Sequence, residues 1–73
     1  MTEQAHELLE TDSVRKRLEA AFARLRQLMR ENTDNRKVQY HGMAQGVLIA
    51  LYELQLMDAD AFDARTAELA SEL

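Results

Sequence analysis

The stretch from Val38 to Met57 constrains the fold of this 73-residue chain most strongly, because it is the most apolar segment of the sequence. An α-helix advances about 100° per residue, so a helix here would have one wide apolar face. That face would contain Tyr40, Met43, Ala44, Val47, Leu48, Ala50, Leu51, Leu54 and Met57. Val38, Ile49 and Leu56 would lie on the opposite side, where a surface helix usually carries charged residues. One neighbouring helix cannot cover both sides, so we expect a second protomer or a target protein to cover the remainder.

The composition predicts a small all-α protein. Pro and Cys are absent and Gly occurs only twice, whereas residues that favour helices are abundant. A single domain of this size buries little surface, and no disulfide is available to support it, so we expect a homodimer. Two histidines are too few for a structural zinc site, and we expect neither a metal ion nor a cofactor.

Apolar periodicity and capping residues predict four helices in a single domain over residues 1–73. The helices are expected over 2–10 (weakly encoded), 13–31 (basic and amphipathic), 35–57 (central) and 59–72 (short). Thr11, Asp12 and Ser13 are typical capping residues and predict a break or bend after the first helix. The turn-forming sequence NTDN at 32–35 would join the next two helices into an antiparallel hairpin that dimerises into a bundle. Asp58 would cap the last helix, which we expect to fold over the open end of the hairpin.

The charges are segregated along the chain. Residues 15–37 carry eight basic residues against three acids, whereas residues 1–14 and 38–73 are acidic, and the total is −4. This pattern fits neighbouring helices that neutralise one another, or a nucleic-acid surface. The first interpretation is favoured because nucleic-acid-binding proteins are usually basic overall. On the alternative, the contacts would come from Arg15, Lys16, Arg26, Arg30, Arg36 and Lys37.

Small residues recur at four-residue spacing along an edge of the wide apolar face, at Gly42, Gly46 and Ala50. Glycine inside a helix costs about 1 kcal/mol relative to alanine, so two of them need a reason. Close approach of a partner helix is one reason, and room for Phe22 or Met29 within the same chain is the other. The predicted dimer interface consists of Gly42, Gly46, Val47, Ala50, Leu51 and Leu54.

Tyr52 has an amphipathic ring suited to an interface, or to packing against the last helix. Together with nearby apolar and acidic residues it forms a predicted partner-binding surface made of Tyr52, Ile49, Leu56, Asp60 and Asp63. No catalytic set of Ser, His and Asp, no Cys nucleophile and no phosphate-binding glycine loop can be assembled from the sequence. We therefore expect a protein that is not an enzyme.

The segment GMAQGVLIALYELQLMDADAFDARTAEL, residues 42–69, combines the Gly-x-x-x-Gly spacing with an Ala-Leu pair and an acidic cap. It resembles the C-terminal half of small bacteriophage-encoded helical-hairpin proteins, and the likeness extends over roughly residues 14 to 70. Among these proteins it is similar to the phage quorum-sensing anti-activator family, whose members are dimeric hairpins that bind a LuxR-type transcription activator and a type IV pilus ATPase. The resemblance implies a phage protein that disables host proteins, and it assigns no individual binding residue.

Two classes of function therefore follow from the sequence. The first is a small protein-binding inhibitor or adaptor in the cytoplasm of a bacterial host, and the alternative is a nucleic-acid-binding regulator. A structural protein that assembles with itself is a third interpretation. No membrane association is expected, because the longest uninterrupted apolar run, residues 47–51, is too short to span a bilayer.

Overall fold

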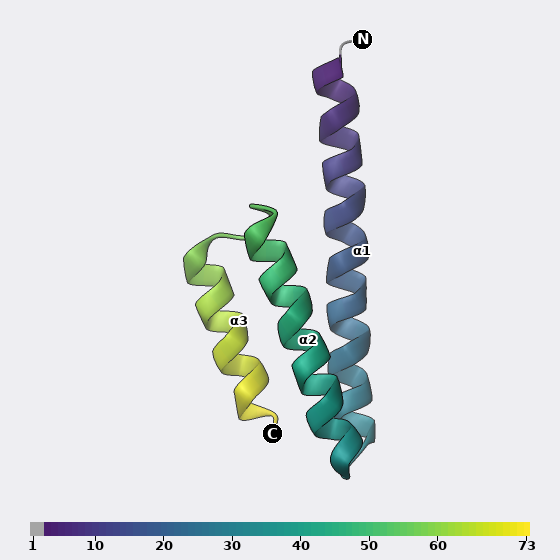
Figure 1. Ribbon diagram of the computed structural model, residues 1–73, viewed down its shortest axis with the longest axis vertical. Coiled ribbons are helices and arrows are strands. Elements are labelled where there is room, and N and C mark those ends of the chain that lie inside the picture. Colours follow the sequence, from purple (N-terminus) through teal and green to yellow (C-terminus); the bar gives the residue numbers. More distant parts are fainter. Residues whose placement is uncertain (1–2) are drawn as a thin grey trace.

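The computed structural model describes the backbone of residues 3–73 and the side chains of residues 11–73. Over these residues the chain is all-α, as its composition predicts: α1 spans Glu3–Glu31, α2 spans Asn35–Glu53 and α3 spans Ala59–Ser71. Each helix runs in the opposite direction to the one before it, and α2 packs against both others (Figure 1). None of the described helices combines the length and the apolar character needed to cross a membrane.

The predicted break at residues 11–13 is absent, because α1 continues through them without interruption. Thr11 and Ser13 are exposed to solvent, and Asp12 lies 3.2 Å from Lys16 in an ion pair one turn along the helix. Residues of these types cost only a few tenths of a kcal/mol each in a helix interior. Without a Gly or Pro at this point, their preference for capping positions is too weak to end the helix.

The connection between α1 and α2 is stabilised by its own polar side chains. The side-chain amide of Asn32 donates a hydrogen bond of 2.7 Å to the carbonyl of Leu28, in the last turn of α1. The carboxylate of Asp34 accepts a hydrogen bond of 3.0 Å from the backbone N–H of Arg36, so Asp34 caps α2. These bonds satisfy backbone groups that a helix end leaves without partners.

The helix expected to end near Met57 ends four residues earlier, at Glu53. Gln55 adopts a left-handed conformation with φ of 60°. The N–H of Leu56 then reaches the carbonyl of Leu51 at 2.8 Å, and the N–H of Gln55 reaches that of Tyr52 at 3.0 Å. This is the Schellman arrangement, in which the left-handed residue is usually Gly, so the sequence carries no signal for it.

Asp58, the predicted cap of the third helix, accepts a hydrogen bond of 2.8 Å from the N–H of Ala61. From there α3 runs back along α2 instead of crossing the open end of the two longer helices (Figure 1). Its inner face contains the buried Leu69 and the half-buried Phe62 and Thr66. Leu73 lies beyond the end of α3 and is 59% exposed.

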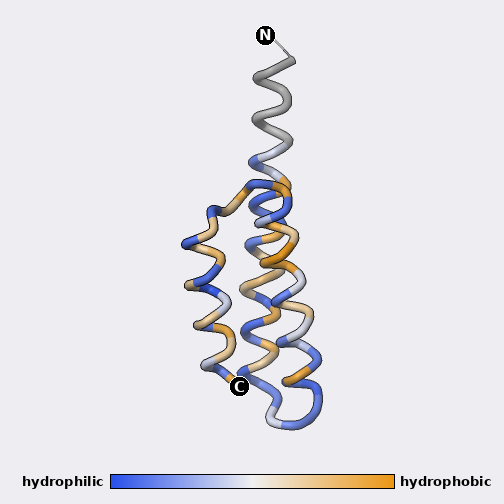
Figure 2. The backbone as a smooth tube through the Cα atoms, turned by 60° about the vertical axis from the view of Figure 1, so that its left-hand side comes forward, coloured by the Kyte–Doolittle hydropathy of each residue, from blue (hydrophilic) through white to orange (hydrophobic). Residues whose placement is uncertain are grey.

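All three helices contribute to one hydrophobic core. Its buried members are Phe22, Met29, Ala44, Leu48, Leu51 and Leu69. All of them lie at positions that helical periodicity predicts to be apolar contacts. The connection from α1 to α2 is hydrophilic (Figure 2). Along α2 itself, exposed apolar residues occur in addition to the core positions, at Val38, Met43 and Ile49. Burial within one chain therefore accounts for only part of the apolar character of α2.

Candidate protein-interaction surfaces

An open pocket of about 530 Å³ lies where α2 turns into α3. Its lining consists of Tyr52, Glu53, Gln55, Leu56, Met57 and Asp58. The ring of Tyr52 is tilted by 38° against the ring of Phe62, with the two centroids 5.1 Å apart. Nevertheless, Tyr52 remains 42% exposed. One side of the ring is thus held by α3, while the rest remains accessible to another molecule.

This corner of the molecule is acidic. Glu53 and Asp58 line the pocket, and Asp60 and Asp63 follow in the first two turns of α3. All four side chains are exposed, and none takes part in an ion pair among residues 11–73. Residues 38–64 contain these four acids and no Lys or Arg, so this part of the chain has a charge of −4. Such a surface favours a basic partner.

The predicted partner-binding residues do not all lie on one surface. Ile49 is 46% exposed and lies on the outer side of α2. Leu56 is half-buried and packs against the core, because α2 has already ended and the chain turns inward. The prediction that Leu56 shares a helix face with Ile49 is therefore wrong, and Leu56 belongs to the pocket wall instead.

A second surface lies along the outer side of α2 and contains several of the residues predicted to form a dimer interface. A Cβ atom added at Gly42 or at Gly46 would meet no atom within 4 Å. Neither glycine therefore makes room for Phe22 or Met29, which excludes that alternative. Leu54 is 56% exposed. Val47 and Ala50 are half-buried.

Leu51 does not belong to this outer surface. It is completely buried in the core, so its assignment to a dimer interface is wrong. Leu51 lies on the wide apolar face predicted for the central helix. α1 and α3 cover the part of that face that contains Leu51 and leave another part exposed. In contrast, Val38 and Met43 were left out of the predicted interface and are 63% and 56% exposed. The absence of any charged residue between positions 38 and 52 is the signal that could have identified them.

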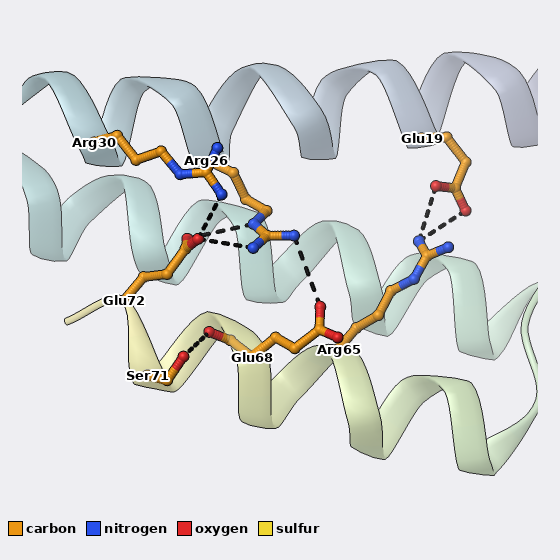
Figure 3. A network of polar contacts seen from close by, with 7 residues as sticks. All are labelled: Glu19, Arg26, Arg30, Arg65, Glu68, Ser71 and Glu72. Carbon is orange, nitrogen blue, oxygen red and sulfur yellow. Dashed lines mark hydrogen bonds and ion pairs between the residues drawn. The ribbon is translucent and has the colours of Figure 1, made fainter.

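A network of ion pairs joins α1 to α3 (Figure 3). The carboxylate of Glu72 accepts hydrogen bonds of 2.7 and 3.3 Å from Arg26 and one of 2.7 Å from Arg30. Further along, the guanidinium of Arg65 donates two hydrogen bonds, of 2.8 and 2.9 Å, to Glu19. The Arg26–Glu72 and Glu19–Arg65 contacts each join residues 46 apart in sequence, so these long side chains bridge α1 and α3, which both pack against α2.

The network also encloses part of the core. The guanidinium carbons of Arg26 and Arg65 lie 5.7 and 5.8 Å from the centroid of the Phe22 ring. Phe22 is only 4% exposed, and cation–π attraction adds to the burial of its ring. The two arginines therefore act as structural residues that cover the core between α1 and α3.

Glu72 is the residue whose protonation this network changes most. Hydrogen bonds from Arg26 and then Arg30 favour its charged form and lower the pKa of Glu72 to about 2, although partial burial acts in the opposite direction. The pKa of Arg26 is raised, chiefly by the same hydrogen bond to Glu72. The pair therefore remains charged under all ordinary conditions.

The six residues of the predicted nucleic-acid surface are engaged to different degrees. Arg26 and Arg30 are bound to Glu72, Lys16 pairs with Asp12, and Arg36 lies 3.6 Å from Asp34. Arg15 is exposed and Lys37 is half-buried. The ion pairs of Arg26 and Arg30 with α3 favour the interpretation that neighbouring helices neutralise one another.

The described residues contain no group of three or more His, Cys, Asp or Glu side chains arranged to hold a metal ion. Tyr40, on the predicted wide apolar face, is half-buried and packs against the core. Comparison with protein-family models, with curated proteins and with solved structures found no match.

Proposed function

We propose that this protein is a small non-enzymatic module that binds another protein and inhibits or recruits it, and that it acts as a homodimeric helical bundle built on α1 and α2. The observation that carries the proposal is the outer side of α2. Val38, Met43 and Ile49 in α2, and Leu54 directly after it, are each between 46% and 63% exposed, and residues 38–52 contain no Asp, Glu, Lys or Arg. Several exposed apolar side chains on one helix are typical of an interaction site rather than of a free surface.

Two adjoining surfaces support two contacts. The outer side of α2 is apolar and uncharged, which suits an interface between copies of the same chain. The corner pocket next to Tyr52 combines an aromatic ring with exposed acids, which suits a basic partner. We assign the first surface to self-association and the second to the target protein.

The proposed target has a basic docking surface, as DNA-binding domains do. The resemblance of residues 42–69 to the phage anti-activator family makes two proteins the first to test, a LuxR-type transcription activator and a type IV pilus ATPase. On this proposal the protein is phage-encoded and acts in the cytoplasm of the bacterial host. Occupying a basic DNA-binding surface would itself inhibit an activator, because the acidic residues around the Tyr52 pocket would compete with DNA phosphate groups for that surface.

The test is direct titration of each purified candidate with the wild-type protein and with three variants. Tyr52→Ala should weaken binding by about 2 kcal/mol, roughly 30-fold, because an exposed aromatic anchor is removed. Asp63→Lys should mainly slow association and reduce its dependence on salt. Glu31→Lys makes the same change of charge at the other end of the molecule and serves as the control. Equal losses for Asp63→Lys and Glu31→Lys, or unfolding of Tyr52→Ala, would show that the binding surface is wrongly assigned.

A further inference from the structure

A row of small residues follows the outer side of α2. Gly42, Gly46 and Ala50 follow one another at four-residue spacing and so lie along one line of the helix. Both glycines are exposed, and open space surrounds the position of their missing Cβ atoms. The backbone of another helix could therefore approach α2 more closely here than along any line that carries larger side chains.

Larger apolar side chains border this row of small residues on both sides. With a rotation of about 100° per residue, Val38 and Ile49 fall on one edge and Met43 and Leu54 on the other. Their exposed fractions are 63% and 46% on the first edge and 56% at both positions on the second. The two apolar edges and the small residues between them thus form a shallow groove along the outer side of α2.

Opposite charges stand at the two ends of the groove. Arg36 is exposed in the first turn of α2, and Glu53 is exposed in its last residue. No charged residue lies between positions 38 and 52. Two such helices side by side in the same direction would bring Arg36 next to Arg36 and Glu53 next to Glu53, which is repulsive. In opposite directions, each basic end meets an acidic end, and the helix dipoles are also antiparallel.

We infer that a second copy of this chain occupies the groove, with the two α2 helices antiparallel about a two-fold axis at Gly46. The inference rests on the self-association proposed above and specifies its geometry. The axis places Gly46 against Gly46 of the second copy, and Gly42 at the same height as Ala50 of the second copy. Arg36 then lies three residues, about 4.5 Å along the axis, from Glu53 of the second copy, within reach of its long side chain.

The same symmetry explains why the small residues occur where they do. The row is palindromic about Gly46, so the small residues at positions 42, 46 and 50 of one copy face those at positions 50, 46 and 42 of the other. Each apolar edge meets the same edge of the second copy, as an isologous interface requires. The pocket at Tyr52 lies at the α3 end of α2 and leaves one target site on each copy.

Cysteine cross-linking tests this arrangement directly, because the chain contains no cysteine of its own. Chains carrying Gly42→Cys and chains carrying Ala50→Cys, distinguished by tags of different size, are mixed and oxidised. Antiparallel helices predict a disulfide between position 42 of one chain and position 50 of the other. Two copies of Gly42→Cys would be about 12 Å apart along the axis, beyond the reach of a disulfide. Parallel helices predict the reverse pattern, and Ala23→Cys, exposed on α1, is the control that should not cross-link.

Light scattering of the unmodified protein at the same concentration completes the test. A mass of twice 8.4 kDa with cross-links between positions 42 and 50 supports the inference. A dimeric mass with cross-links between identical positions, or with none, overturns the antiparallel geometry but leaves the proposed dimer intact. A monomeric mass overturns both the dimer and its geometry, while the titrations with target proteins stay independent of this result.

A substitution at the axis provides a second measurement. Gly46→Leu should raise the dissociation constant of the dimer at least tenfold, because its side chain would occupy the position of the second helix. In the dilute monomer the same variant should unfold at no lower temperature than the wild type, since the space around Gly46 is open. An unchanged dissociation constant would overturn the inference.

Discussion

Glu72, directly after the end of α3, accepts hydrogen bonds of 2.7 and 3.3 Å from Arg26 in the C-terminal part of α1. The chain between them contains both turns and all of α2. This contact therefore depends on the complete arrangement of the three helices. Its partial shielding from solvent, with 17% of the Glu72 side chain and 28% of the Arg26 side chain exposed, makes it stronger than an ordinary surface ion pair.

The contribution of Glu72 to stability should depend on pH. Its pKa is lowered from 4.5 to about 2 in the folded protein, so its contribution is fully present above about pH 4.5 and is lost as the pH falls toward 2. At pH 7, Glu72→Gln should lower the free energy of unfolding by about 1 to 2 kcal/mol, a value reduced for solvent screening around Arg30. Thermal unfolding of both proteins from pH 7 to pH 2 should show this difference shrinking below pH 4.5. A difference that stays constant over this range would contradict the assignment.

Replacing the left-handed residue at the end of α2 by glycine should stabilise the protein. Gln55 has a φ of 60°, which costs a residue with a side chain about 1 kcal/mol that glycine avoids. Gln55→Gly should therefore raise the free energy of unfolding by roughly that amount. The matched control is Gln39→Gly, at an exposed position inside α2, which should lower it by about 1 kcal/mol. Chemical denaturation measures both, and destabilisation by Gln55→Gly would show that α2 ends differently.

Two leucines three residues apart should respond differently to the same substitution. Leu51 is completely buried, so Leu51→Ala should lower the free energy of unfolding by about 2 to 5 kcal/mol. Leu54 is 56% exposed, so in the dilute monomer Leu54→Ala should change it by less than about 0.5 kcal/mol. Light scattering at higher concentration should show that Leu54→Ala weakens the dimer. Equal thermal destabilisation of the two variants in the monomer would mean that Leu54 also belongs to the core.

The arginines of α1 should affect stability and not nucleic-acid affinity. Arg26 and Arg30 are engaged with Glu72, so we expect no binding of DNA or RNA tighter than micromolar at physiological salt. Arg26→Ala with Arg30→Ala should instead lower the unfolding temperature, because Glu72 and the Phe22 ring lose their partners. The measurements are a gel-shift titration over a range of salt concentrations and a thermal melt. Salt-dependent binding at nanomolar protein, lost in this variant, would favour the nucleic-acid alternative.

Helical periodicity and capping residues account for the sequence-based predictions that the structure confirms. All six buried core residues lie at predicted apolar positions, and Asp34 and Asp58 cap their helices through their own carboxylates. The predicted break at Thr11, Asp12 and Ser13 failed because it depends on free-energy differences of a few tenths of a kcal/mol, which local sequence does not resolve.

The sequence by itself determined what depends on neighbours within a few residues along the chain: helical structure, the caps, and which side chains of each helix are apolar. Only the tertiary structure decided what depends on residues far apart. The pairing of Arg26 with Glu72 and of Glu19 with Arg65 spans 46 residues and follows from α1 and α3 both packing against α2. Likewise, α1 and α3 cover one side of α2 and leave the other exposed. Periodicity states that a face is apolar, but only packing selects which part of that face is buried within the chain.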